Sequence, residues 1–167
     1  MEYGIALGSN IGDRLDSLRR AVALLEPHRQ PGIQLLKAPV YETTPVDCNP
    51  GSGAFLNTVI IAHFSPTPRD LLDVTQKIEQ TLGREEKRQR NAPRVVDLDL
   101  LYADAKEIAT DVLTLPHPRL SRRRFVLEPL ARVRPDLILP GQGATIRELL
   151  DTLHSDEPPL TLHVEEW

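Results

Sequence analysis

The sequence has few of the features that mark exported and membrane proteins. Its 167 residues include one cysteine, Cys48, which cannot form an internal disulfide and to which we assign no role. No stretch of about 18 uncharged apolar residues occurs, so a transmembrane helix is excluded. The chain also begins without a basic region followed by a long apolar run, which is the pattern of an export signal. We therefore expect a cytoplasmic protein with no membrane association.

An excess of positive charge is also absent. The formal net charge is -4, whereas domains that bind nucleic acid are usually strongly basic because they neutralise many phosphates. The Lys and Arg residues nevertheless gather in two clusters, 84–94 and 119–124. Such clusters on an acidic chain suit a compact polyanion, although any one loop cation is more often simply solvated. Nucleic acid is therefore not an expected partner.

The chain lacks the phosphate-binding loop of P-loop kinases. It contains no Gly-x-x-x-x-Gly-Lys-Ser/Thr pattern, and the turn Gly8-Ser9-Asn10 is too short to replace that loop. Any phosphate chemistry must therefore depend on another arrangement of residues.

Hydrophobic periodicity predicts alternating strands and helices along the first hundred residues. Apolar runs bounded by turn residues predict four strands, at 3–7, 34–41, 55–64 and 95–102. Apolar residues at helical spacing predict two helices, from Asp13 to Pro27 and from Thr67 to Gly83, each beginning at a side chain that can cap it. The resulting order β-α-β-β-α-β is that of a ferredoxin-like α+β fold.

Beyond this βαββαβ core, the sequence predicts C-terminal helices and an added strand. A short helix is expected at 123–130, and another from Thr145, where Glu148 completes a capping box. A last strand at 160–164 is expected to extend the sheet. With 40% hydrophobic residues the chain can bury one core, so we expect a single domain spanning 1–167.

Two acids stand on one predicted strand, in the segment Val95-Val96-Asp97-Leu98-Asp99-Leu100-Leu101. Because successive side chains of a strand point to opposite faces, Asp97 and Asp99 share one face. Aspartate is disfavoured in strands, and two carboxylates on one face repel each other unless a cation relieves the repulsion. Hard cations such as Mg²⁺ bind carboxylate and phosphate oxygens, so we interpret the pair as a seat for two metal ions. The alternative is a solvent-facing strand with two ordinary acids.

Basic residues flank this acid pair. Arg94 immediately precedes the strand, and Arg84 begins the basic loop that leads to it. Phosphoryl transfer depends on positioning and on neutralising charge over phosphate oxygens, which Mg²⁺ and arginine supply. The second basic cluster adjoins Pro116-His117-Pro118, whose prolines would hold the His117 imidazole in a defined direction. A lone surface histidine is more often inert, so His117 is a candidate only in this context.

Six groups of residues together resemble a known family. They are Ala6-Leu7-Gly8-Ser9-Asn10, Tyr41-Glu42-Thr43-Thr44-Pro45, Phe55-Leu56-Asn57, Ile78-Glu79 with Gly83-Arg84, Pro93-Arg94-Val95-Val96-Asp97-Leu98-Asp99, and Pro116-His117-Pro118 with Arg123-Arg124-Phe125-Val126-Leu127. Their order and spacing, from Ile5 to about Pro140, are similar to those of 6-hydroxymethyl-7,8-dihydropterin pyrophosphokinases. The resemblance implies an enzyme of folate biosynthesis that transfers a diphosphate from ATP to 6-hydroxymethyl-7,8-dihydropterin and releases AMP.

The resemblance also implies roles for individual residues. Two Mg²⁺ ions would be held by Asp97 and Asp99, and the catalytic set would be completed by Arg84 and Arg94. ATP would be contacted by Gln76, Glu79, Arg84, Arg94, His117 and Arg123. The pterin would be bound by the rings of Phe55 and Phe125, by Asn57, and by backbone groups of Thr44, Pro45 and Val46. Stacked rings add about 0.5 to 1.5 kcal/mol beyond burial, which suits a flat heterocycle, although both phenylalanines could equally be ordinary core.

Two other functions are compatible with parts of the sequence. An Asp-x-Asp pair also seats a metal in glycosyltransferases, whose donor is a sugar nucleotide, but 167 residues is short for such an enzyme. A ferredoxin-like module could instead bind RNA, but the expected basic and aromatic-rich strand is absent. The expected partners are therefore ATP and the pterin alone, with the chain acting as a monomer. The sequence identifies no general base, and Glu86 and Asn91 depart from residues that some family members carry.

Overall fold

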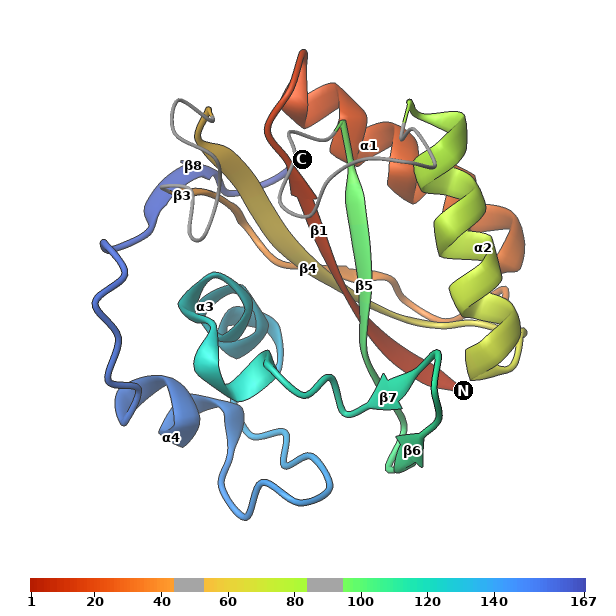
Figure 1. Cartoon of the computed structure of the whole chain (residues 1–167). Coiled ribbons are helices and arrows are strands. Elements are labelled where there is room, and N and C mark those ends of the chain that lie inside the picture. The colour runs from red at the N-terminus through yellow and green to blue at the C-terminus, as the bar shows by residue number, and fades with distance from the viewer. Residues whose placement is uncertain (44–52, 84–94) are drawn as a thin grey trace.

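The computed structural model describes residues 1–43, 53–83 and 95–167, and an antiparallel sheet lies at its centre (Figure 1). The strands follow one another in the order β5-β1-β4-β3-β8, and the short β2 pairs with β4. Their bounds are β1 Glu2–Ser9, β2 Leu36–Lys37, β3 Val40–Thr43, β4 Phe55–His63, β5 Asp97–Ala103 and β8 Thr161–Val164. The order β5-β1-β4-β3 is that of a ferredoxin-like sheet, as predicted, and β8 is the predicted added strand.

Helices α1 (Arg14–Leu25) and α2 (Pro68–Thr81) cover one face of the sheet (Figure 1). Both begin where predicted, because Asp13 and Thr67 each accept a backbone N–H of the first helical turn through the side chain. A short 3-10 turn, Glu26–His28, follows α1. The apolar stripes of the two helices pack with inward-facing strand residues in the larger of two core clusters.

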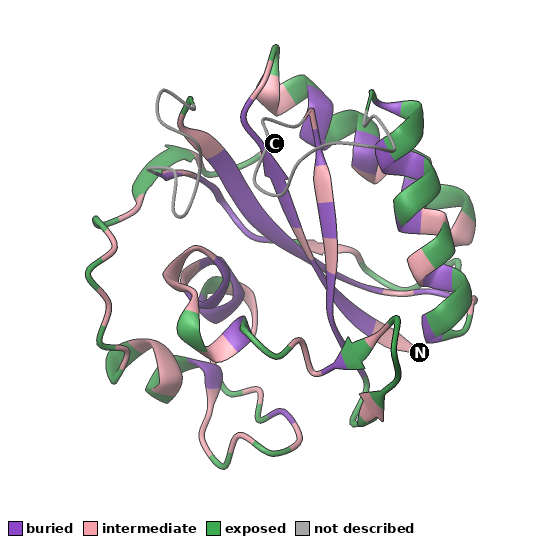
Figure 2. Ribbon diagram, viewed as in Figure 1, coloured by how far each residue is buried: buried purple, intermediate pink, exposed green. Residues whose placement is uncertain are grey.

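Helices α3 (Arg124–Val133) and α4 (Ile146–Asp151) lie on the opposite face, so the sheet is buried between two helical layers (Figures 1 and 2). The predicted capping box of Thr145 and Glu148 is present at the start of α4. Because both faces are covered, β4 is buried at seven consecutive positions, 56–62. None of the helices in the described ranges has the length and apolar composition needed to cross a membrane.

Some element boundaries differ from the prediction. The expected strand 34–41 is divided into β2 and β3, because Pro39 has no N–H to donate and the Ala38 carbonyl accepts from the Thr58 hydroxyl. The short helix expected at 123–130 runs instead from Arg124 to Val133. A hairpin that was not predicted follows β5. It is formed by β6 (Ile108–Ala109) and β7 (Thr114–Leu115), and a 3-10 turn at Leu120–Arg122 comes after it.

Candidate active site

Three predicted site residues lie on one face of the sheet, on β4 and on the edge strand β5. In the register of β1, Gly8 lies opposite Asn57 of β4 on one side and opposite Asp97 of β5 on the other. Asp99 lies two residues further along β5, opposite Ala6. Alternation along the strands places Asn57, Asp97 and Asp99 on the face covered by α3. With strands about 4.8 Å apart, the Cα atoms of Asn57 and Asp97 are about 10 Å apart.

The lack of a side chain at Gly8 lets Asn57 pack closely against β1. A Cβ atom at Gly8 would lie 2.9 Å from Asn57 Oδ1 and 3.8 Å from Phe55 Cδ1. Asn57 is 8% exposed, and its Nδ2 donates to Thr43 Oγ1 over 2.7 Å. This bond holds the amide in one orientation, with Oδ1 towards Gly8. Two predicted pterin residues, Phe55 and Asn57, therefore border a position that carries no side chain of its own.

Arg123 connects the acid pair to α3. Its Nη1 lies 3.8 Å from Asp99 Oδ2, and its guanidinium carbon lies 5.3 Å from the centre of the Phe125 ring. Burial, and next the charge of Arg119, lower the pKa of Arg123 from its usual value, whereas Asp99 and Asp97 act in the opposite direction. One cation thus contacts both a predicted metal ligand and a predicted pterin residue.

The acid pair fits Mg²⁺ by its donor chemistry. Asp97 and Asp99 are both partly exposed on β5, and protein-bound Mg²⁺ typically uses one or two carboxylates together with water and substrate phosphates. Within ranges 1–43, 53–83 and 95–167, no group of three or more His, Cys, Asp and Glu side chains could hold a metal ion. Two partly exposed carboxylates would suit an open site, in which the ion is shared with a phosphate ligand, better than a closed structural site.

His117 lies beside β5 as a neutral ring. Its backbone N–H donates to the Leu101 carbonyl over 2.8 Å, and its Nδ1 accepts from the Arg119 N–H over 3.1 Å. Burial, followed by the charges of Arg123 and Arg119, lowers the pKa of His117 to about 4. The ring is therefore neutral near pH 7. Because Nδ1 is an acceptor, the proton resides on Nε2, which is available as a donor.

A cavity of about 300 Å³ adjoins the same residues. Asp99 and His117 line it together with apolar side chains from α2, β5 and the β6–β7 hairpin, among them Leu72, Leu98 and Leu113. None of these three apolar residues was predicted to line the site, and Leu113 belongs to the hairpin, which was not predicted. The signal that could have revealed the hairpin is the polar Thr-Asp turn at 110–111, which stands between two short strand-forming pairs.

The two predicted ribose contacts on α2 differ in burial. Gln76 is exposed. Glu79 is 3% exposed, and its Oε1 accepts from the Leu98 N–H over 2.7 Å. This hydrogen bond from Glu79 therefore links α2 to β5 beside the acid pair. A ribose contact by either residue stays a prediction.

Five predicted site residues lie outside the described residues. They are Thr44, Pro45 and Val46 in the segment 44–52, and Arg84 and Arg94 in the segment 84–94. Cys48, Glu86 and Asn91 belong to the same two segments. The roles predicted for the five site residues therefore stay predictions.

Comparison with known proteins identifies close sequence relatives. Residues 4–135 match the family described as 7,8-dihydro-6-hydroxymethylpterin-pyrophosphokinase (HPPK). The 2-amino-4-hydroxy-6-hydroxymethyldihydropteridine pyrophosphokinase of Bacillus subtilis is 45% identical over 129 residues, which are 77% of this chain and 75% of that protein. The protein of the same name from Methylorubrum extorquens is 38% identical over 149 residues, which are 89% of this chain and 91% of that protein.

Solved structures agree on the fold. The crystal structure of Plasmodium falciparum HPPK-DHPS A437G with pteroate resembles this chain with a TM-score of 0.68 at 15% identity, covering 90% of this chain. This chain spans 42% of the length of that larger protein, and at such low identity the likeness concerns the fold alone. The sequence matches carry the assignment further: the chain belongs to the 7,8-dihydro-6-hydroxymethylpterin-pyrophosphokinase family, which acts at the pyrophosphokinase step of folate biosynthesis.

Proposed function

We propose that this chain transfers the diphosphate group of ATP to the hydroxyl of 6-hydroxymethyl-7,8-dihydropterin, with release of AMP, in a Mg²⁺-dependent reaction. The main support is the row formed by Asn57, Gly8 and Asp97 in three adjacent strands, which brings a predicted pterin residue and a predicted metal ligand onto one surface. Residues 1–167 would act as one domain and as a cytoplasmic monomer whose partners are these small molecules. Family membership decides against the glycosyltransferase and RNA-binding alternatives.

The bonds that change are those around the β-phosphorus of ATP. The pterin oxygen forms a bond to this phosphorus, and the bond from the same phosphorus to the oxygen that bridges it to the α-phosphorus breaks. The hydroxyl proton is lost, and AMP leaves with the bridging oxygen. Negative charge therefore develops between the α- and β-phosphates, where the protein must provide cations or hydrogen-bond donors.

The pterin is proposed to lie over Gly8, between the rings of Phe55 and Phe125. Asn57 supports this placement because its Oδ1 is directed towards Gly8 and can accept from a pterin N–H group. One hydrogen of its Nδ2 is occupied by Thr43, so the second remains for a pterin acceptor. Backbone groups of 44–46, which follow Thr43 in the chain, would bond the rest of the polar edge.

The nucleotide is proposed to occupy the cavity of about 300 Å³ beside β5. Leu72, Leu98 and Leu113 would form apolar walls for the flat base, because ligand sites are mostly apolar with a few placed polar groups. His117 would donate from Nε2 to a phosphate oxygen. Gln76 and Glu79 would lie near the ribose.

Charge at the phosphates is proposed to be met by the acid pair and by arginines. Asp97 and Asp99 would hold two Mg²⁺ ions, which when bound neutralise charge on the phosphate oxygens. Arg123 would contribute from α3, where it already lies 3.8 Å from Asp99. Arg84 and Arg94 would complete the set, since the planar guanidinium suits bidentate contacts with phosphate.

The products of the reaction test the proposed function directly. Enzyme, Mg²⁺, the pterin alcohol and ATP labelled at the γ-phosphate should yield AMP and a labelled pterin diphosphate, because attack at the β-phosphorus transfers the β- and γ-phosphates together. Chromatographic separation of nucleotides and pterins measures both products. Stoichiometric ADP with a pterin monophosphate would show transfer of the γ-phosphoryl group alone and would overturn the proposal.

Removing either carboxylate of the acid pair should stop most turnover without loosening the fold. Asp97→Asn and Asp99→Asn are each expected to lower kcat at saturating Mg²⁺ by about 100-fold or more, because charge on the phosphates is left unneutralised. The melting temperature without metal should change little, since relief of like-charge repulsion on β5 offsets the weakened attraction to Arg123. Asp136→Asn, at an exposed position after α3, is the matched control. Near wild-type turnover in either site variant would refute the metal assignment.

Gly8→Ala should weaken pterin binding far more than ATP binding. The added methyl group would lie 2.9 Å from Asn57 Oδ1, so the amide must turn and lose its bond to Thr43. Calorimetric titration of 6-hydroxymethylpterin, with Mg²⁺ and a non-hydrolysable ATP analogue present, should show a Kd about tenfold higher. In an Asn57→Ala background the same change should have a smaller effect, because only the contact of the methyl group with the pterin then remains. Equal losses of pterin and ATP affinity would point instead to a folding defect.

His117 should make the free energy of unfolding depend on pH. Its pKa is about 4 in the folded protein against 6.5 in the unfolded chain, so the unfolded state takes up the proton first as the pH falls. The contribution of the neutral ring is complete above about pH 6.5 and is lost progressively towards about pH 4. Urea denaturation should therefore show wild type losing more stability over this range than His117→Gln. A difference between the two proteins that does not change with pH would contradict the assignment.

A further inference from the structure

Residues 154–167 lie beyond the part of the chain that matches the family, which ends at residue 135. The segment runs from α4 to β8, and β8 extends the sheet beside β3 (Figure 1). Leu162 pairs there with Tyr41, which in turn pairs with Asn57 of β4. Near its other end the segment contacts the start of α3 through Glu157. It therefore touches two of the elements around the proposed pterin site.

The contact with α3 supplies a cap that the helix itself lacks. Arg123 occupies the N-cap position, and its side chain makes no capping hydrogen bond. Glu157 Oε2 instead accepts from the Arg124 N–H over 3.3 Å, although the two residues are 33 positions apart in the chain. The Glu157 N–H donates to Ser155 Oγ over 3.1 Å, which fixes the local turn that presents the carboxylate. An acceptor at this point satisfies a helix N–H that would otherwise have no intrahelical partner.

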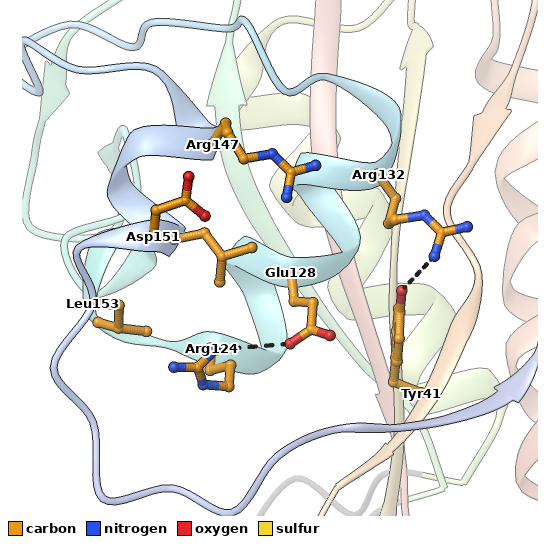
Figure 3. Close-up of a pocket in the computed structure, with 8 residues that line it drawn as sticks. Tyr41, Arg124, Glu128, Arg132, Arg147, Asp151 and Leu153 are labelled. Atoms are coloured by element: carbon orange, nitrogen blue, oxygen red, sulfur yellow. Dashed lines mark hydrogen bonds and ion pairs between the residues drawn. The ribbon is translucent and has the colours of Figure 1, made fainter.

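The other contacts of α3 on this side are mainly polar. A cavity of about 390 Å³ lies beside the apolar contacts of α3 with α4 and the sheet, and Arg124, Glu128 and Arg132 line it from α3 (Figure 3). Across the cavity Arg132 donates to the Tyr41 hydroxyl over 3.4 Å, and beside it Arg132 pairs with Glu165 of the same segment at 2.5 Å. The apolar face of α3 packs in the second core cluster, whereas its side towards this cavity is held by polar contacts.

We infer that Glu157 is a positioning residue for pterin binding. Its carboxylate holds the first turn of α3, and Phe125 is the second residue of that helix. If the first turn frays, the Phe125 ring and the neighbouring Arg123 guanidinium lose their fixed places over the sheet. Glu157 itself contacts neither substrate in this proposal. The inference rests on the proposed function, because it concerns the affinity of the same pterin site.

The inference is tested by measuring the pterin Kd. 6-Hydroxymethylpterin is titrated into the full chain with Mg²⁺ and a non-hydrolysable ATP analogue, at a temperature well below the melting temperature of every variant. Glu157→Ala should raise the pterin Kd about tenfold, whereas Glu157→Gln should stay close to wild type because its amide oxygen can still accept. Ser155→Ala keeps the Glu157 carboxylate but removes the hydrogen bond from the Glu157 N–H to Ser155 Oγ. It should therefore raise the pterin Kd by a smaller factor than Glu157→Ala. Asp156→Asn, an exposed neighbour, is the matched control for loss of charge.

The melting temperature of each variant separates positioning from stability. Wild-type pterin affinity in both Glu157→Ala and Ser155→Ala would overturn the inference, with or without a lower melting temperature. If Asp156→Asn lost as much pterin affinity as Glu157→Ala, the inference would also be overturned. The loss would then depend on the negative charge of the segment and not on the hydrogen bond to α3. If wild type itself fails to bind the pterin, the proposed function fails instead, so the two failures are distinguishable.

Discussion

The register of β1 between β4 and β5 is the constraint on which the site depends. A slip of one residue turns every side chain of a strand to the other face. For β5, such a slip would direct Asp97 and Asp99 into the core beneath α1 and α2 and turn Leu98 and Leu100 away from it. Burying two carboxylates in an apolar layer is far more costly than burying the leucines. The same apolar packing that stabilises the fold therefore holds the acid pair on the side of α3.

Because β5 is the last strand of the main sheet on its side, its backbone groups need partners from outside the sheet. The buried Glu79 carboxylate accepts the Leu98 N–H, and the His117 N–H donates to the Leu101 carbonyl. Both contacts lie next to the acid pair, so the groups that complete the sheet edge also bring α2 and the Pro-flanked loop to the site. The pKa of His117 is lowered to about 4, so near pH 7 its ring adds no positive charge beside Arg119 and Arg123.

Helix α3, in the second helical layer, forms the side of the proposed site that faces the sheet. Arg123 and Phe125 come from the start of α3, whereas Phe55 and Asn57 come from the sheet below. The distance between these two groups is not set by the sheet itself. It depends on how α3 is held, and the contact from Glu157 is one of the interactions that hold it.

Local patterns in the sequence were sufficient for the long strands, the capped helices and the acid pair, but not for the β6–β7 hairpin. The caps at Asp13 and Thr67 involve hydrogen bonds across three residues, and the shared face of Asp97 and Asp99 follows from strand alternation, so each could be derived without knowledge of distant segments. The pairing of Gly8 with Asn57, the apolar lining of the cavity beside β5, the neutral state of His117 and the cap from Glu157 could not be derived in this way. Each depends on which segments far apart in the chain come together, and strand register and helix packing decide that only in the folded protein.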